Sequence, residues 1–232
     1  MFKKSTFAGL LLVALSAMLA VGCSDDDDNP MTSTPPSPSN VMIVHASPDA
    51  PEVDVLINDG TAVEDLGFTA NTGYVPLTPG EYNVKVNAAN TTTTVINENL
   101  ALDPAANYTV FAVDQLSEIT VLVLADDLTT PASGKAHVRF VHLSPDAPAV
   151  DIALAGGGAV LFPNVSFTEF LGFAPLDAGT YDLEVRVAGT STVALPLPNI
   201  TLQAGKIYTV YAKGFLAGSG AQALGAEIIV NN

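Results

Sequence analysis

Residues 41–55 read VMIVHASPDAPEVDV, and residues 138–152 read VRFVHLSPDAPAVDI. The two segments are one motif written twice, with His45 and His142 at matching positions 97 residues apart. A repeat of this length contains enough residues for a small hydrophobic core of its own. The repeat therefore predicts two tandem domains of one fold.

The likeness between the copies continues downstream of the motif. Residues 74–86, YVPLTPGEYNVKV, match residues 173–187, FAPLDAGTYDLEVRV. Residues 100–112, LALDPAANYTVFA, match residues 200–212, ITLQAGKIYTVYA. We expect one domain at residues 41–127, a linker LTTPASGK at residues 128–135, and a second domain at residues 136–232.

Short segments rich in β-branched residues and separated by turn residues predict an all-β fold. Seven strands in under about a hundred residues favour an immunoglobulin-like or transthyretin-like β-sandwich. In the first copy we expect strands at residues 41–46, 52–57, 66–75, 81–88, 92–98, 106–113 and 118–125.

Four tyrosines recur in pairs, Tyr82 with Tyr181 and Tyr108 with Tyr208. The segments LTPGEY and LDAGTY resemble the tyrosine corner of fibronectin type III domains, in which the hydroxyl bonds nearby backbone. We assign all four tyrosines a structural role.

Side chains alternate along a strand, so Val41, Ile43 and His45 share one face. In the second copy Arg139 lies on the face opposite His142, and we expect that face to be the wetter one. Each histidine is then expected on or beside the core. The Ser-Pro-Asp segment that follows predicts a turn back into the next strand.

Four interpretations of this corner stay open. In the structural one, its polar groups satisfy backbone atoms around a tight turn. A hydrolytic site would use Ser47 and His45, although no oxyanion hole is recognisable beside them. A third interpretation is direct contact with a ligand or partner. The fourth is a divalent cation site in each copy, made of His45, Asp49 and Asp54, and of His142, Asp146 and Asp151.

The N-terminus has the composition of a bacterial signal peptide. Lys3 and Lys4 precede an uncharged apolar run, and Leu19 to Cys23, LAVGC, resembles the lipobox of bacterial lipoproteins. We expect cleavage after residue 22, acylation of Cys23 (palmitate among the acyl chains), and a disordered acidic, Pro- and Ser-rich tether up to residue 40. The protein would be held by this lipid anchor at the outer membrane or cell surface, with a periplasmic-facing position as the alternative.

The charge of the chain excludes one class of partner. Removing residues 1–22 takes away Lys3 and Lys4 and lowers the net charge from −16 to −18. Such an acidic surface repels nucleic acid. The sequence also lacks a phosphate-binding glycine loop and a CxxC motif, so no cofactor is expected.

The repeated VHxSPDAPxVD signature, the YTV strand and the junction LVLADDLTTPASGKAHVRFVH resemble a bacterial family known as domain of unknown function 4397. The resemblance covers nearly all of residues 41–232, with two copies of the domain. It implies secreted or lipid-anchored proteins and a domain without assigned activity.

We therefore expect a non-catalytic envelope lipoprotein whose sandwiches bind an unknown extracellular partner or act as a spacer. The alternative is a metal-binding or hydrolytic module at the two corners. Carbohydrate binding is disfavoured, because the chain has no tryptophan.

The lipid anchor gives the first testable prediction. Mass spectrometry of the mature protein should find its N-terminus at Cys23, with the added mass of acyl chains. An unmodified N-terminus on any other residue would contradict the prediction.

Overall fold

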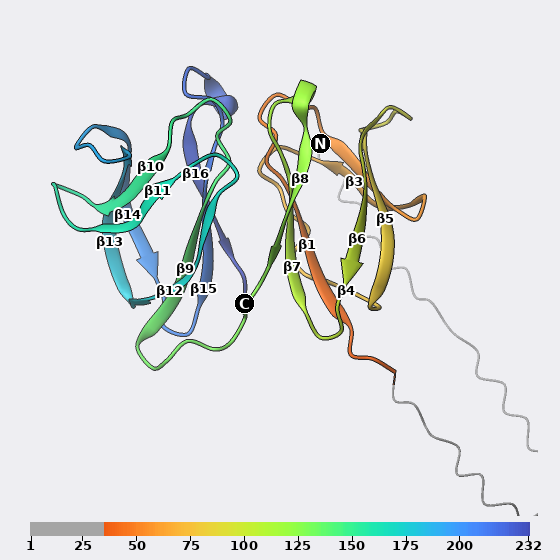
Figure 1. Ribbon diagram of the computed structural model, residues 1–232, viewed down its shortest axis with the longest axis horizontal. Helices are drawn as coiled ribbons and strands as arrows, with labels where there is room; N and C mark the ends of the chain where they lie inside the picture. Colours follow the sequence, from red (N-terminus) through yellow and green to blue (C-terminus); the bar gives the residue numbers. More distant parts are fainter. Residues whose placement is uncertain (1–34) are drawn as a thin grey trace, which may run out of the picture. The chain divides into compact units, whose positions relative to one another are not determined.

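The computed structural model describes residues 35–232, and Figure 1 shows their course. The predicted signal peptide, Cys23 and most of the predicted tether lie outside the described residues. The described part contains sixteen β-strands and two short 3-10 helices. No helix in this part is long and apolar enough to span a membrane.

Eight strands form the first half of the described chain. They pair into two sheets with the strand orders β4-β1-β7-β8 and β3-β2-β5-β6. The only parallel pair among them is β1 with β7. The elements are β1 (Ser39–His45), β2 (Val53–Ile57), β3 (Gly60–Leu66), β4 (Val75–Leu77), β5 (Gly80–Ala88), β6 (Thr94–Leu102), β7 (Asn107–Val113), the 3-10 helix η1 (Leu116–Glu118) and β8 (Thr120–Ala125).

The second half repeats this topology with the strand orders β12-β9-β15-β16 and β11-β10-β13-β14. No strand of one half pairs with a strand of the other in the described chain. The prediction of an all-β chain with two tandem β-sandwich halves is confirmed. The elements are β9 (Lys135–His142), β10 (Val150–Leu154), β11 (Val160–Val165), β12 (Phe170–Asp177), β13 (Gly179–Val187), β14 (Val193–Leu202), β15 (Ile207–Lys213), the 3-10 helix η2 (Gly220–Gln222) and β16 (Gly225–Val230).

The strand predicted at residues 66–75 is wrong. Residues 67–74 instead connect β3 in one sheet to β4 in the other. Thr69 and Gly73 have positive φ angles of 69° and 65°, which no regular strand accommodates. The turn-forming residues Gly67, Asn71 and Gly73 lie within this crossing between sheets.

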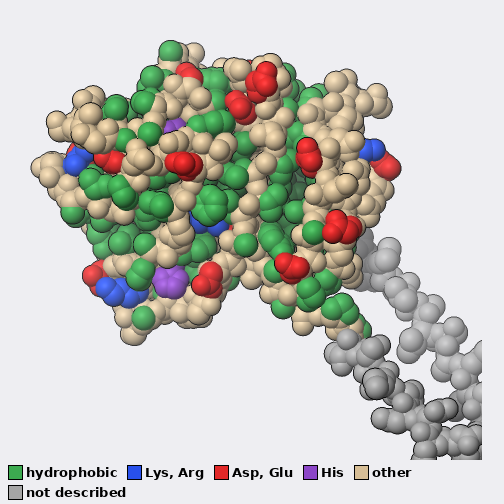
Figure 2. Space-filling model, viewed as in Figure 1, with side chains coloured by type: hydrophobic (Ala, Val, Ile, Leu, Met, Phe, Trp, Pro, Cys, Tyr) green, Lys and Arg blue, Asp and Glu red, His purple; other side chains and the backbone are tan. Residues whose placement is uncertain are grey.

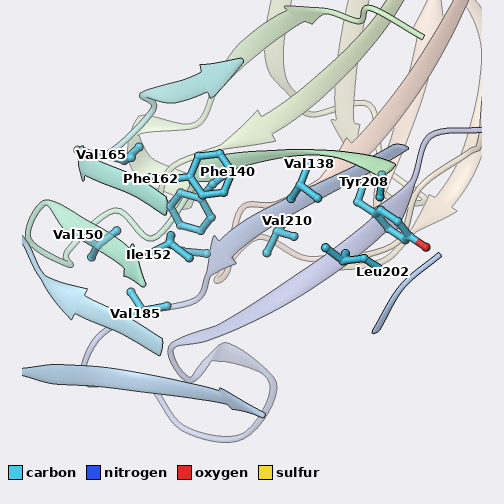
Figure 3. Close-up of a cluster of buried hydrophobic side chains, with 12 residues drawn as sticks. Val138, Phe140, Val150, Ile152, Phe162, Val165, Val185, Leu202, Tyr208 and Val210 are labelled. Atoms are coloured by element: carbon cyan, nitrogen blue, oxygen red, sulfur yellow. The ribbon is translucent and has the colours of Figure 1, made fainter. Parts of the chain in front are cut away.

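Each sandwich has its own apolar core, filled by alternate side chains of facing sheets. Figure 3 shows the core of the second half, where residues from β9 and β15 face residues from β10 and β13. Burial of these side chains from water is the main stabilising contribution to each sandwich. The residues seen there include Val138, Phe140, Val210, Ile152 and Val185.

A further apolar cluster joins the two halves. It is formed by the faces of the sheets β4-β1-β7-β8 and β12-β9-β15-β16 that point away from each sandwich's own core. These two sheets are therefore buried on both faces at their centre. The cluster contains Met42, Val44, Ala46, Phe111, Val113 and Leu124 from the first half and Val141, Leu143, Tyr211 and Ile229 from the second.

This contact overturns the expectation that the face of Arg139 is the wetter one. Arg139 lies on that face of β9 and is only 1% exposed. Its charge is neutralised by Asp126, with 2.7 Å between Nη1 and Oδ1. A charged residue on a strand usually marks a solvated face. Here the first half covers this face, and its Asp126 carboxylate supplies the counter-charge of Arg139.

Tyr211 gives a stability prediction. Its hydroxyl is buried and has no hydrogen-bond partner in the described part of the chain, whereas the equivalent residue of the first half is Phe111. An unsatisfied buried hydroxyl costs about 1–3 kcal/mol. We expect Tyr211→Phe to raise the free energy of unfolding by about 1 kcal/mol in urea titrations.

Tyr208→Phe is the matched control on the same strand. The Tyr208 hydroxyl accepts a hydrogen bond from the Gln203 amide at 3.0 Å, so its removal should destabilise the protein. Equal losses in both variants would show that the Tyr211 hydroxyl has a partner in solution.

Candidate functional site

The repeated motif forms a corner in each half. β1 ends at His45 and the chain turns through Ser47 and Pro48 before it enters β2. β9 ends at His142 and makes the same turn into β10. The two histidines are completely buried, so each ring must satisfy its nitrogens inside the protein.

The imidazole of His45 spans its own turn. Its Nδ1 accepts a hydrogen bond from the Ser47 amide at 3.3 Å, so the neutral ring carries its proton on Nε2. Nε2 then donates to the Pro51 carbonyl at 2.9 Å. His142 makes the same two bonds, to the Ser144 amide at 3.3 Å and the Pro148 carbonyl at 3.0 Å.

The corner serines do not pair with the histidines. Ser144 donates from Oγ to the Gly214 carbonyl at 2.6 Å. The Oγ of Ser47 is buried and makes no hydrogen bond within the described residues. Because the Nδ1 and Nε2 atoms of both rings are bound to backbone, neither serine has a base beside it. The geometry lacks the pairing that the hydrolytic hypothesis needs.

Asp49 connects its corner to the loop between β7 and β8, and Asp146 connects its corner to the loop between β15 and β16. The Oδ1 atom of Asp49 accepts a hydrogen bond from the Leu116 amide at 2.7 Å. Asp146 accepts one from the Leu216 amide, also at 2.7 Å. These bonds connect parts of the chain 67 and 70 residues apart, so both aspartates organise long-range structure.

Asp54 and Asp151 use both carboxylate oxygens. Asp54 accepts from the Asp65 and Asn90 amides, each at 3.0 Å. Asp151 accepts from the Asn164 amide at 2.7 Å and the Gly189 amide at 2.9 Å. Each carboxylate thereby joins its own strand to two neighbouring connections.

The structure therefore does not bring either candidate metal set together. The histidine, the turn aspartate and the strand aspartate each bind a different stretch of backbone. Among residues 35–232, no three His, Cys, Asp or Glu side chains are placed to share a metal ion.

The four recurrent tyrosines also bind backbone. Tyr82 donates to the Thr78 carbonyl and Tyr181 to the Asp177 carbonyl, both at 2.8 Å and four residues upstream. The Tyr108 hydroxyl accepts from the Asp103 amide at 3.3 Å, as Tyr208 does from Gln203. The backbone partners of the hydroxyls occupy equivalent positions in the two copies.

Sequence reasoning missed a buried polar network between the halves. Arg139 donates from Nε to Thr209 Oγ1 at 2.8 Å and from Nη2 to Thr109 Oγ1 at 3.1 Å. Thr109 donates to Asp126 Oδ2 at 2.6 Å, and Thr209 to Asn231 Oδ1 at 2.8 Å. The guanidinium of Arg139 also lies 4.6 Å from the centre of the Phe173 ring. The sequence signal that could have indicated this network is Arg139 itself, a charged residue at the position where the first copy has the apolar Met42.

Tyr74 completes this network. Its hydroxyl donates to Asp126 Oδ2 at 2.5 Å and accepts from Asn231 Nδ2 at 2.9 Å. Burial, together with the adjacent Asp126 carboxylate, raises the pKa of Tyr74 to about 12. The hydroxyl therefore stays protonated and acts as a donor to the carboxylate at neutral pH.

The family model described as a domain of unknown function (DUF4397) matches residues 39–153 and 154–231. The chain belongs to this family. The two matches correspond to two tandem copies of the DUF4397 domain. The boundary between the matches, at residues 153 and 154, falls within the last two residues of β10 in the second sandwich. None of the curated proteins compared with this chain matches it.

Two solved structures resemble this DUF4397 protein distantly. The C-terminal domain of AlgF from P. aeruginosa is 23% identical, with a TM-score of 0.32, covering 42% of this chain and 98% of that domain. The CBM26 domain CBMbc of Eubacterium rectale Amy13K, in complex with maltoheptaose, is 10% identical, with a TM-score of 0.27, covering 82% of this chain and 96% of that domain.

The corner histidines predict a pH-dependent stability. Burial lowers the pKa of both His45 and His142, partly opposed by their proline carbonyl partners. The unfolded chain therefore binds protons more readily than the folded protein just below pH 6.5. We expect the free energy of unfolding to be highest above about pH 6.5 and to fall between pH 6.5 and 5.

The double variant His45→Asn, His142→Asn should be less stable at pH 7.5 by about 1 kcal/mol per site and should lose part of this pH dependence. Urea titrations at several pH values measure both effects. His137→Asn is the control, since this ring belongs to neither corner. An unchanged pH dependence in the double variant would contradict the prediction.

Proposed function

We propose that this protein is a non-catalytic, lipid-anchored module of the bacterial cell envelope. The observation that carries the proposal is the hydrogen bonding of the two corners. In both copies the imidazole and both aspartates bind backbone groups of their own half. These groups stabilise the fold, and they are not free to act on a substrate.

The anchor in this proposal is Cys23, placed after an apolar signal sequence and before the acidic, Pro- and Ser-rich segment. Acyl chains on this residue would hold the protein at the outer membrane or the cell surface by burying their methylene groups. The two sandwiches would then be displayed in the aqueous phase.

Contacts with an extracellular or envelope partner would be made by loops carried on the two sandwiches. The β7–β8 connection is short and contains η1, whereas the β15–β16 connection runs from Gly214 to Leu224 and exposes Leu216. A Cβ atom on Gly214 would lie 2.3 Å from the Ala223 carbonyl oxygen, so this longer loop is closely packed on itself. It is the clearest structural difference between the halves and our first candidate for a partner contact.

The surface charge agrees with this proposal. Figure 2 shows acidic side chains scattered singly over the visible face, with few Lys and Arg side chains among them. Such a surface favours solubility and disfavours nucleic acid and other polyanions. No observation on the described residues favours the alternative of a metal-binding or hydrolytic corner.

Metal analysis tests this proposal against that alternative. We expect protein purified without chelator to contain no stoichiometric divalent ion. Asp54→Asn and Asp151→Asn should each lower stability by about 1.5–3 kcal/mol, because an amide NH₂ replaces an acceptor that faces a backbone N–H. The loss should be larger for Asp151, which is 7% exposed. A stoichiometric ion that is lost in these variants would overturn the proposal.

A further inference from the structure

The interface between the halves is built from equivalent positions of the two copies. The motif makes Met42 of β1 equivalent to Arg139 of β9. Phe111 of β7 is equivalent to Tyr211 of β15, and Tyr74 is equivalent to Phe173.

Strand register extends this equivalence to β8 and β16. Thr109 pairs with Leu124 as Thr209 pairs with Ile229. Asp126 lies two residues after Leu124, and Asn231 lies two residues after Ile229, so these two residues are equivalent. The amides of these two residues donate to the equivalent carbonyls of Asn107 and Ile207, both at 2.8 Å.

The contacts follow the same symmetry. Phe111 and Tyr211, which are equivalent residues, contact each other edge to face, with 5.6 Å between ring centroids. Equivalent residues meet in this way at the axis of a twofold interface. The bond from Thr109 to Asp126 is repeated by the bond from Thr209 to Asn231. The two halves thus pack like the subunits of a twofold homodimer joined in one chain.

Two equivalent positions break this symmetry in charge. The first half has Met42 and Asp126 where the second has Arg139 and Asn231. Two first halves paired through this face would bury two carboxylates without a cation. Two second halves would bury two guanidinium groups without a carboxylate. Only a first half with a second half neutralises both charges, and an unpaired buried charge is strongly unfavourable.

We propose that this face of the domain is a self-recognition surface whose partner is another copy of the same domain, and that Arg139 and Asp126 select which copies pair. The selection favours a first half with a second half and disfavours pairing between like halves of different chains. Since the face is occupied within the chain, an external partner has to use the outer sheets, β3-β2-β5-β6 and β11-β10-β13-β14, or the loops.

The symmetry predicts that the ion pair can be moved to the equivalent position. In the full mature chain, D126N/R139M removes the native pair and is the reference. Adding M42R and N231D creates an arginine on the first half opposite a carboxylate on the second. The two controls each add only one member, M42R/D126N/R139M and D126N/R139M/N231D.

Urea unfolding of these four variants forms a double-mutant cycle. We expect the chain with both additions to have a midpoint higher than that of either control by about 1 M urea, and to remain monomeric by light scattering. If the D126N/R139M reference does not fold, recovery of folded protein in the quadruple variant, but in neither control, supports the proposal equally. Absence of coupling between the M42R and N231D substitutions, or failure of the quadruple variant to fold, overturns the proposal.

Discussion

A guanidinium group buried between two β-sheets has to find its counter-charge inside the protein. Arg139 is 1% exposed, and Asp126, which neutralises it, follows the last strand of the other half. Removing one member of a buried pair typically costs about 3–5 kcal/mol, because the other charge stays in a poorly solvating site. This requirement fixes how the two sandwiches of the described chain pack, and it accounts for the hydrogen bonds of Thr109 and Thr209.

The two corners obey the same physical rule on a smaller scale. Each imidazole connects the two ends of its own turn, and each aspartate binds amides that the turn and the neighbouring loops would otherwise leave unpaired. A buried amide without an acceptor is costly, so polar residues at a tight corner are expected for structural reasons alone. The motif resembles a catalytic or metal-binding cluster in residue types, but its atoms are already bound to the backbone.

The motif residues and the face between the halves are both occupied by contacts within the protein, so the exposed surface is left for contacts with other molecules. The conspicuous residues of the sequence support the corners, and one face of each half is occupied by the other half. A binding role for the protein would therefore depend on the loops and the outer sheets. The loop between β15 and β16 differs most between the copies and is the place where the halves can differ in what they contact.

The sequence by itself determined the all-β class, the two copies and a position of His45 on or beside the core, because alternating β-branched residues and a long repeat express local rules. It also indicated which tyrosines recur at equivalent positions. It did not locate β3 and β4, because the local sequence does not show where the chain passes from one sheet to the other. Only the tertiary structure decided that the face of Arg139 is buried, since that burial depends on how the first half packs on the second, with Thr109, 30 residues away, as one of its contacts. A strand pattern shows which side chains share a face, but the solvent or partner on that face is decided by long-range packing.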